Sequence, residues 1–179
     1  MILVVDLCHK PGSLSQREFV LPIARIVGTD AVVKHYTQLD PGILGQADKV
    51  ILCGTALKDN KFAEDIVSFE WLKDFGKPVL GICAGMQVIG AVFGCERIQA
   101  KEIGMTHIDV SAPCPLFDEG FEAYELHGHS IAPNNEFEVL AKTEVSVQAI
   151  KHKKLPIYGI MFHPEVRNET VVKRFLKIG

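Results

Sequence analysis

The stretch Pro78-Val79-Leu80-Gly81-Ile82-Cys83-Ala84-Gly85-Met86-Gln87 predicts a buried strand that runs directly into a helix, with a cysteine at the corner. Gly81 and Gly85 stand two residues on either side of Cys83, which is the G-x-C-x-G form of a nucleophile elbow. Glycine leaves room for the tight bend that pushes the reactive side chain outward. We therefore take Cys83 as a candidate catalytic nucleophile.

The segment after this corner predicts a core helix. Residues 84–93 are apolar apart from Gln87, and Gly94 supplies a glycine stop. Cys83 would then lie at a helix N-terminus, where unpaired N–H groups and the helix dipole favour thiolate over thiol. A lone buried cysteine can equally be a small hydrophobic residue, so the assignment requires a base.

Length and composition predict a single domain spanning residues 1–179. The formal net charge of −3, without a basic cluster, gives no electrostatic reason to expect nucleic acid or a membrane surface as partner. The five cysteines are odd in number and lack C-x-x-C spacing, which favours a reducing, cytoplasmic location without a disulfide framework or structural metal. The uncharged run 78–95 contains four glycines, so we interpret it as strand, turn and helix and not as a membrane span.

The first half of the chain alternates between strand and helix patterns. Apolar runs predict strands at 2–5, 31–33, 49–53 and from Pro78 to the corner; helical patterns predict helices at 15–27, 41–46 and 60–75. Gly28 and Gly76 stop two of these helices. This alternation predicts a three-layer, doubly wound α/β fold with a mostly parallel sheet, whose ligands bind at the carboxyl ends of the strands.

The pattern changes beyond Gly94. Isolated apolar residues from Ile98 to Val110 predict antiparallel strands or a hairpin, so we expect a small antiparallel addition to the sheet. Three more short strands are predicted at 137–140, 147–150 and 156–161, and a closing helix at 169–177.

Phe162-His163-Pro164-Glu165 supplies the base that Cys83 needs. Pro164 disfavours helix at His163, and in an extended backbone residues two apart point to the same side. Glu165 could then orient His163, whose other ring nitrogen would face the thiol. The alternative is that His163 and Glu165 form a solvent-exposed ion pair that contributes little to stability.

Together, Gly81-Ile82-Cys83-Ala84-Gly85-Met86-Gln87 and Phe162-His163-Pro164-Glu165-Val166 resemble the class I glutamine amidotransferase family. The similarity covers most of the chain from about Val50 onwards and implies a flavodoxin-like fold. Within the family, residues 140–150 and 155–159 are most similar to the amidotransferase subunit of two-subunit GMP synthases.

The resemblance implies that Cys83 attacks the carboxamide of L-glutamine, with His163 as acid and base and Glu165 behind it. It also implies substrate-binding roles for Gly54, Thr55, Ala84, Gln87, Gly128 and His129. In this scheme the N–H groups of Ala84 and of the turn after the third strand hold the oxyanion. No cofactor is expected in this chain, and ATP and magnesium belong to a separate synthetase partner.

Three stretches depart from the family pattern, and one of them is the first loop, residues 7–12, which does not resemble the glycine-rich start of GMP synthase amidotransferases. Gly54-Thr55-Ala56 replaces a Gly-Gly-Pro turn, and Thr55 would be strained if the turn requires a positive φ. Residues 125–130 occupy the place of a family loop near the substrate, with His129 where aspartate or phenylalanine is usual. His127 and His129 could instead ligate a metal, although no third ligand is evident, and an ordinary polar loop also remains open.

Three functions follow from these observations. The first is a glutaminase subunit that passes ammonia to a separate synthetase, such as an ATP-dependent enzyme acting on xanthosine monophosphate to make GMP. The second is a free-standing γ-glutamyl hydrolase. The third is a catalytically silent regulatory subunit, suggested by the altered oxyanion turn.

Overall fold

The computed structural model describes residues 1–179 as nine strands in one sheet, with the order β2-β1-β3-β4-β9-β8-β7-β5-β6. The parallel part consists of β1 (Ile2–Asp6), β2 (Ala31–His35), β3 (Lys49–Leu52), β4 (Val79–Ile82) and β9 (Ile157–Ile160). The antiparallel part consists of β8 (Val147–His152), β7 (Phe137–Lys142), β5 (Glu96–Val110) and β6 (Phe121–Ala132). The predicted α/β architecture is confirmed, and its antiparallel part contains a long β5–β6 hairpin.

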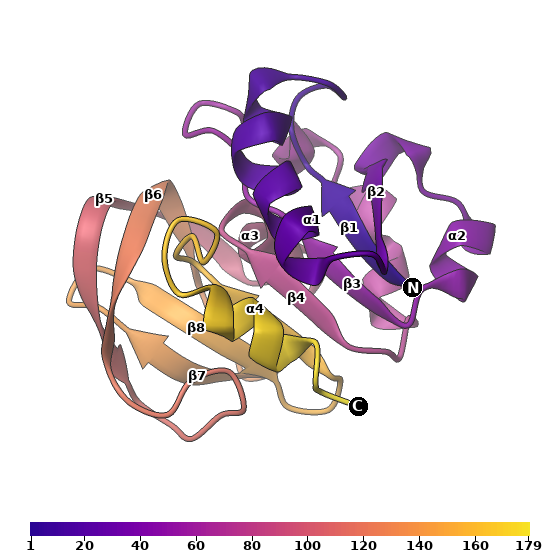
Figure 1. The fold of residues 1–179 in the computed structure, drawn as a ribbon. Coiled ribbons are helices and arrows are strands. Elements are labelled where there is room, and N and C mark those ends of the chain that lie inside the picture. The colour runs from indigo at the N-terminus through magenta and orange to yellow at the C-terminus, as the bar shows by residue number, and fades with distance from the viewer.

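Helices cover both faces of the parallel strands (Figure 1). A π-helical turn η1 (Gln16–Val20) leads into α1 (Leu21–Val27), which packs beside α4 (Glu169–Phe175). On the other face α3 (Ala84–Val92) lies against β4 and β9, beside two 3₁₀ segments, η3 (Lys61–Glu64) and η4 (Ile66–Lys73). Two short elements, α2 (Pro41–Gln46) and the 3₁₀ turn η2 (Tyr36–Gln38), complete the set.

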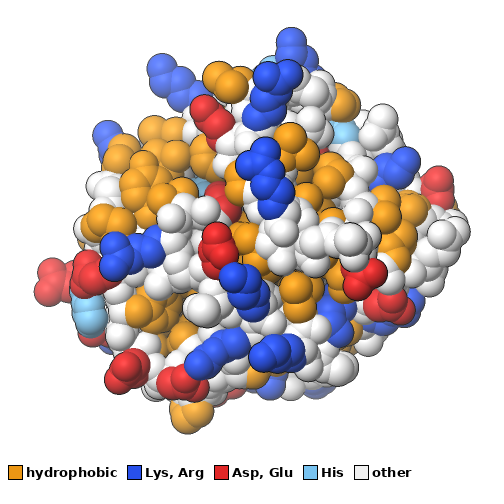
Figure 2. Space-filling view, in the orientation of Figure 1, with side chains coloured by type: hydrophobic (Ala, Val, Ile, Leu, Met, Phe, Trp, Pro, Cys, Tyr) orange, Lys and Arg blue, Asp and Glu red, His pale blue; other side chains and the backbone are white.

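The core lies between the parallel strands and these helices. The β4 strand is buried throughout, as is α3 apart from Ala91, which explains why this part of the sequence lacks a polar face. Charged side chains of both signs are scattered over the face that carries α1 and α4 (Figure 2). None of the helices has the length and apolar character needed to cross a membrane.

The glycine stops are confirmed, because Gly28 and Gly94 adopt φ values of 86° and 75° after α1 and α3. The prediction of one helix over 60–75 was wrong in type, because the segment forms η3 and η4 with a non-helical Asp65 between them. Neither segment has a side-chain cap, and the β-branched pair Ile66-Val67 follows the break. The apolar side chains predicted to face the sheet still do so, since Phe62, Phe69 and Leu72 are buried in the core.

Candidate active site

The corner predicted at Cys83 is a strained strand-to-helix turn. Cys83 is the N-cap of α3 and has φ 49° and ψ −100°, a conformation that side chains rarely adopt. A Cβ on Gly81 would lie 2.5 Å from the carbonyl carbon of Gly85, and a Cβ on Gly85 would collide with the carbonyl oxygen of Leu52. The two glycines are therefore required by close backbone contact, which is how they permit the elbow.

His163 and Glu165 follow β9 and are held together by a short hydrogen bond of 2.7 Å between Nδ1 and Oε1. Both side chains are almost completely buried, which excludes the solvated surface pair. The expected extended backbone was wrong, because Val166 N–H donates to the His163 carbonyl in a turn over residues 164–166. The turn, and not a strand pleat, brings the carboxylate to the imidazole.

The imidazole of His163 lies near Cys83, and both side chains lie against Gly54. An ideal Cβ on Gly54 would lie 2.7 Å from His163 Cε1 and 3.6 Å from Cys83 Cβ. Burial alone would lower the pKa of His163, but the negative charges of Cys83 and Glu165 outweigh it and raise the pKa well above its usual range. Nδ1 is bound to Glu165, and Nε2 has no hydrogen-bond partner. Nε2 is therefore the ring nitrogen that remains to exchange a proton with the thiol.

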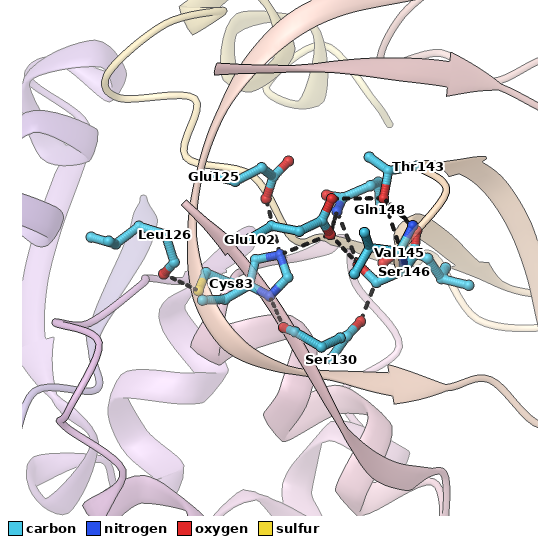
Figure 3. Close-up of polar contacts among 12 residues, drawn as sticks. Cys83, Glu102, Glu125, Leu126, Ser130, Thr143, Val145, Ser146 and Gln148 are labelled. Atoms are coloured by element: carbon cyan, nitrogen blue, oxygen red, sulfur yellow. Dashed lines mark hydrogen bonds and ion pairs between the residues drawn. The ribbon is translucent and has the colours of Figure 1, made fainter. Parts of the chain in front are cut away.

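The β6 strand holds both partners in place. The His163 N–H donates to the Tyr124 carbonyl at 2.9 Å, and the Cys83 thiol donates to the Leu126 carbonyl at 3.8 Å (Figure 3). The prediction that residues 125–130 form a loop was wrong, because they pair with β5 inside β6. The backbone near the nucleophile is therefore the edge strand of the sheet.

The turn after β3 supplies an available N–H without strain. Thr55 is not among the residues with positive φ, so the conformational difficulty expected for it does not arise. Its N–H makes no hydrogen bond, while its Oγ1 donates to the Asp59 carbonyl at 3.0 Å. Ala84 is the first residue of α3, where helical N–H groups have no partner within the helix. Thr55, Cys83 and Ala84 line the same pocket, so two backbone N–H groups without partners are available near the thiol.

A small pocket lies at Cys83. Five of the six predicted substrate-binding residues line it: Thr55, Ala84, Gln87, Gly128 and His129. The sixth, Gly54, lies against His163 and Cys83 and does not line the pocket.

Sequence reasoning missed three polar residues that line the same pocket, namely Asp59, Asn60 and Arg97. Arg97 Nε donates to Gln87 Oε1 at 3.0 Å, and its Nη2 donates to Asn60 Oδ1 at 2.6 Å. Arg97 and Gln87 are ten residues apart in the sequence and no local pattern joins them, so finding the contact required the packing of β5 against α3 to be known.

Glu102 and Glu125 belong to a buried cluster of ionisable side chains (Figure 3). His127 Nε2 is 3.1 Å from Glu125 and 3.4 Å from Glu102, and its Nδ1 contacts the Ala100 carbonyl at 2.8 Å. Glu102 also accepts hydrogen bonds from Thr143, Ser146 and Gln148. Burial, partly offset by His127, raises the pKa of Glu125. These contacts occupy His127, and no group of three or more potential ligands is arranged to hold a metal ion.

The other four cysteines differ from Cys83 in their surroundings. Cys8 and Cys53 are fully buried, and burial raises the pKa of both thiols. Cys95 and Cys114 are half-buried with pKa values raised by the same cause. All five are free thiols, and Cys83 is the one that stands at a helix N-terminus beside an imidazole.

Comparison with known proteins gives the following relatives. Residues 23–178 match the family Glutamine amidotransferase class-I. A subunit of GMP synthase (glutamine-hydrolyzing) from Pyrococcus abyssi is 33% identical, covering 86% of this chain and 88% of the relative. The subunit of that name from Thermoplasma volcanium is 28% identical and covers 99% and 93%. The one from Methanocaldococcus jannaschii is 38% identical over 112 residues, 56% of this chain and 60% of the relative.

Solved structures give the same fold. A protein described as a GMP synthase subunit from Thermoplasma acidophilum superimposes with a TM-score of 0.84 and 28% identity, over 98% of this chain and 91% of that one. A glutamine amidotransferase from Thermotoga maritima has a TM-score of 0.71 at 19% identity, covering 98% and 80%. The second likeness concerns the fold alone.

Proposed function

This chain belongs to the class-I glutamine amidotransferase family, and we propose that Cys83, His163 and Glu165 hydrolyse L-glutamine to glutamate and ammonia for a separate synthetase. The observation that carries the proposal is the geometry of His163. Its Nδ1 is bound to Glu165 at 2.7 Å, its Nε2 has no hydrogen-bond partner, and the ring is close enough to Cys83 for the charge of that sulfur to raise the pKa of His163. This is the arrangement of base and orienting carboxylate that activates a thiol.

In this mechanism His163 Nε2 takes the thiol proton and the sulfur attacks the carboxamide carbon of glutamine. The N–H groups of Thr55 and Ala84 stabilise the oxyanion of the tetrahedral intermediate. His163 then gives its proton to the departing ammonia and leaves a thioester on Cys83. With His163 as base, a water molecule hydrolyses the thioester, which releases glutamate and restores the thiol.

We further propose that the ammonia aminates xanthosine monophosphate to GMP on a partner that binds ATP and magnesium. The names of the relatives from Pyrococcus abyssi and Thermoplasma volcanium support this acceptor. The absence of a phosphate-binding loop or dinucleotide motif from the sequence supports placing nucleotide chemistry on the partner. The argument for a catalytically silent role was that the altered turn could lack an oxyanion donor. That argument is weakened, because Thr55 keeps an available N–H in an unstrained turn.

The test is a measurement of glutamate release and GMP formation with purified chain, synthetase partner, ATP, magnesium and xanthosine monophosphate. We expect slow glutamate release by the chain alone, faster release with the partner, and loss of both in Cys83→Ala. Cys95→Ala is the matched control, because Cys95 lies outside the pocket, and it should retain activity. Activity in Cys83→Ala would refute the nucleophile. Partner-independent hydrolysis of γ-glutamyl peptides would favour the hydrolase, and no turnover in any mixture would favour the silent regulatory role.

A further inference from the structure

Glu125 is a buried carboxylate that the fold itself does not satisfy. It is fully buried in β6, and neither of its oxygens has a hydrogen-bond partner. The residue opposite it on β5 is Gly104, which offers no side chain. Buried carboxylate oxygens are normally hydrogen-bonded, because an unpaired buried charge costs free energy. A carboxylate placed at such a cost calls for a reason outside the stability of the fold.

His127 is the cation beside Glu125, and its contacts fix its charge. Its Nδ1 lies 2.8 Å from the Ala100 carbonyl, which accepts and cannot donate, so Nδ1 carries a proton. Its Nε2 lies 3.1 Å from Glu125 and 3.4 Å from Glu102 (Figure 3). A bare lone pair would face two carboxylates there, so Nε2 is protonated as well and His127 is an imidazolium.

Glu102 anchors this imidazolium. Its two oxygens accept hydrogen bonds from three side chains of β8 and of the turn before it, which stabilise the ionised form. Glu102, His127 and Glu125 together therefore carry one negative charge in excess. Since hydrogen bonds satisfy Glu102 and none satisfies Glu125, the uncompensated charge is that of Glu125.

The backbone on either side of Glu125 holds the nucleophile and its base. The carbonyl of Tyr124 accepts the His163 N–H at 2.9 Å. The carbonyl of Leu126 accepts the Cys83 thiol at 3.8 Å. The uncompensated charge thus belongs to the residue that stands between these two contacts.

The charge of Glu125 acts on His163. Burial raises the pKa of Glu125, whereas the positive charges of His127 and His163 lower it. The attraction between two charges acts on both partners, so the ionised form of Glu125 favours the protonated form of His163. The other negative groups are Cys83 and Glu165, which act on His163, and Glu102, which acts on Glu125.

We propose that Glu125 is a positioning residue for glutamine hydrolysis, whose buried charge keeps His163 protonated until its proton passes to the departing ammonia. His127 and Glu102 hold the carboxylate in place. The proton on His163 is the one taken from the Cys83 thiol, so the step needs no further reactant. This inference rests on the proposed glutaminase function and adds a second carboxylate to it, beside the one of Glu165 that orients the ring through Nδ1.

The experiment compares the pH profile of kcat/KM for L-glutamine between the wild type and variants, each with the synthetase partner. Glu125→Gln should move the alkaline limb to lower pH, so that kcat/KM on that limb falls by about 3- to 30-fold, the range for losing one partly screened charge. On the plateau kcat/KM should stay within about twofold, because His163 is protonated there in both proteins. Glu125→Asp keeps the charge and should restore the limb. The matched control is Glu122→Gln on the same strand, where the carboxylate is exposed and paired with His107, and it should leave the profile unchanged.

A second measurement does not depend on turnover. Histidine side chains are titrated by NMR in Cys83→Ala protein, and the His163 signal is assigned from its loss in His163→Asn. Adding Glu125→Gln should lower the pKa of His163, because an attractive negative charge is removed. The same result without any turnover by the wild type would support the charge effect while removing the proposed reaction.

The two measurements separate a charge effect from a packing role of Glu125. If Glu125 only packs β6 against the elbow, Glu125→Gln lowers kcat/KM by the same factor at every pH and leaves the titration of His163 unchanged. Either of these results overturns the proposal.

Discussion

Gly54→Ala provides a direct test of how the catalytic groups are packed. The φ of Gly54 is not positive, so the backbone itself tolerates alanine. The new methyl group would instead lie 2.7 Å from His163 Cε1 and 3.2 Å from Nδ1. Carbon atoms in contact are normally about 3.5–4.0 Å apart, so the imidazole must move by about 1 Å.

A displacement of this size acts mainly on catalysis. The ring is held to Glu165 by a 2.7 Å hydrogen bond, which the displacement lengthens or bends. A misplacement of about 1 Å costs on the order of 10²-fold in rate, so we expect that loss in glutamate release. Overpacking should lower the free energy of unfolding by about 1–3 kcal/mol, which leaves the variant folded.

Three measurements check this prediction: glutamate release, alkylation of Cys83 by iodoacetamide followed by mass spectrometry, and urea unfolding. Alkylation should slow together with glutamate release, because both need His163 beside the sulfur. The matched control is Gly45→Ala in α2, where a methyl group meets nothing within 4 Å. It should keep full activity and gain about 0.5–1 kcal/mol of stability. Gly54→Ala with activity and alkylation within twofold of the wild type would refute the proposed packing.

Three further predictions concern the carboxylates and the elbow. Glu165→Gln should lower the pKa of His163 and reduce glutamate release by about 10²-fold or more; an unchanged pH–rate profile would contradict this. Burial raises the pKa of Glu125, so the folded protein keeps a proton that the unfolded chain loses above about pH 4.5, and stability falls as pH rises through that window. Relative to the wild type, Glu125→Gln should therefore gain stability from pH 4.5 towards 7 in urea unfolding, and a pH-independent difference would oppose the idea. Gly85→Ala should lower the stability of the protein more than Gly90→Ala. The methyl group at position 85 would meet a backbone carbonyl, whereas the one at position 90 would meet the side chain of Ile131, which can rotate. The reverse order of melting temperatures in thermal unfolding would be evidence against the elbow packing.

The parallel strands, the elbow at Cys83 and the helix after it follow from the sequence alone. Their signals are local: apolar runs, glycines two residues from the cysteine, and a glycine at the helix end. The partnership of His163 with Glu165 was also predicted from two neighbouring positions, although a turn and not an extended strand produces it.

The tertiary structure alone decided which other side chains face the nucleophile. The β5–β6 pairing shifts register between Gln99 and Glu102, and this bulge brings Glu102 against His127. The packing of β5 against α3 brings Arg97 to Gln87. The connection between β5 and β6 is ten residues long, so no tight turn fixes how the two strands pair. A shift of one residue would reverse which side chains point inward, and nothing local in the sequence distinguishes the two registers. For that reason the sequence predicted the candidate nucleophile and base, whereas packing determined which other polar side chains line the pocket.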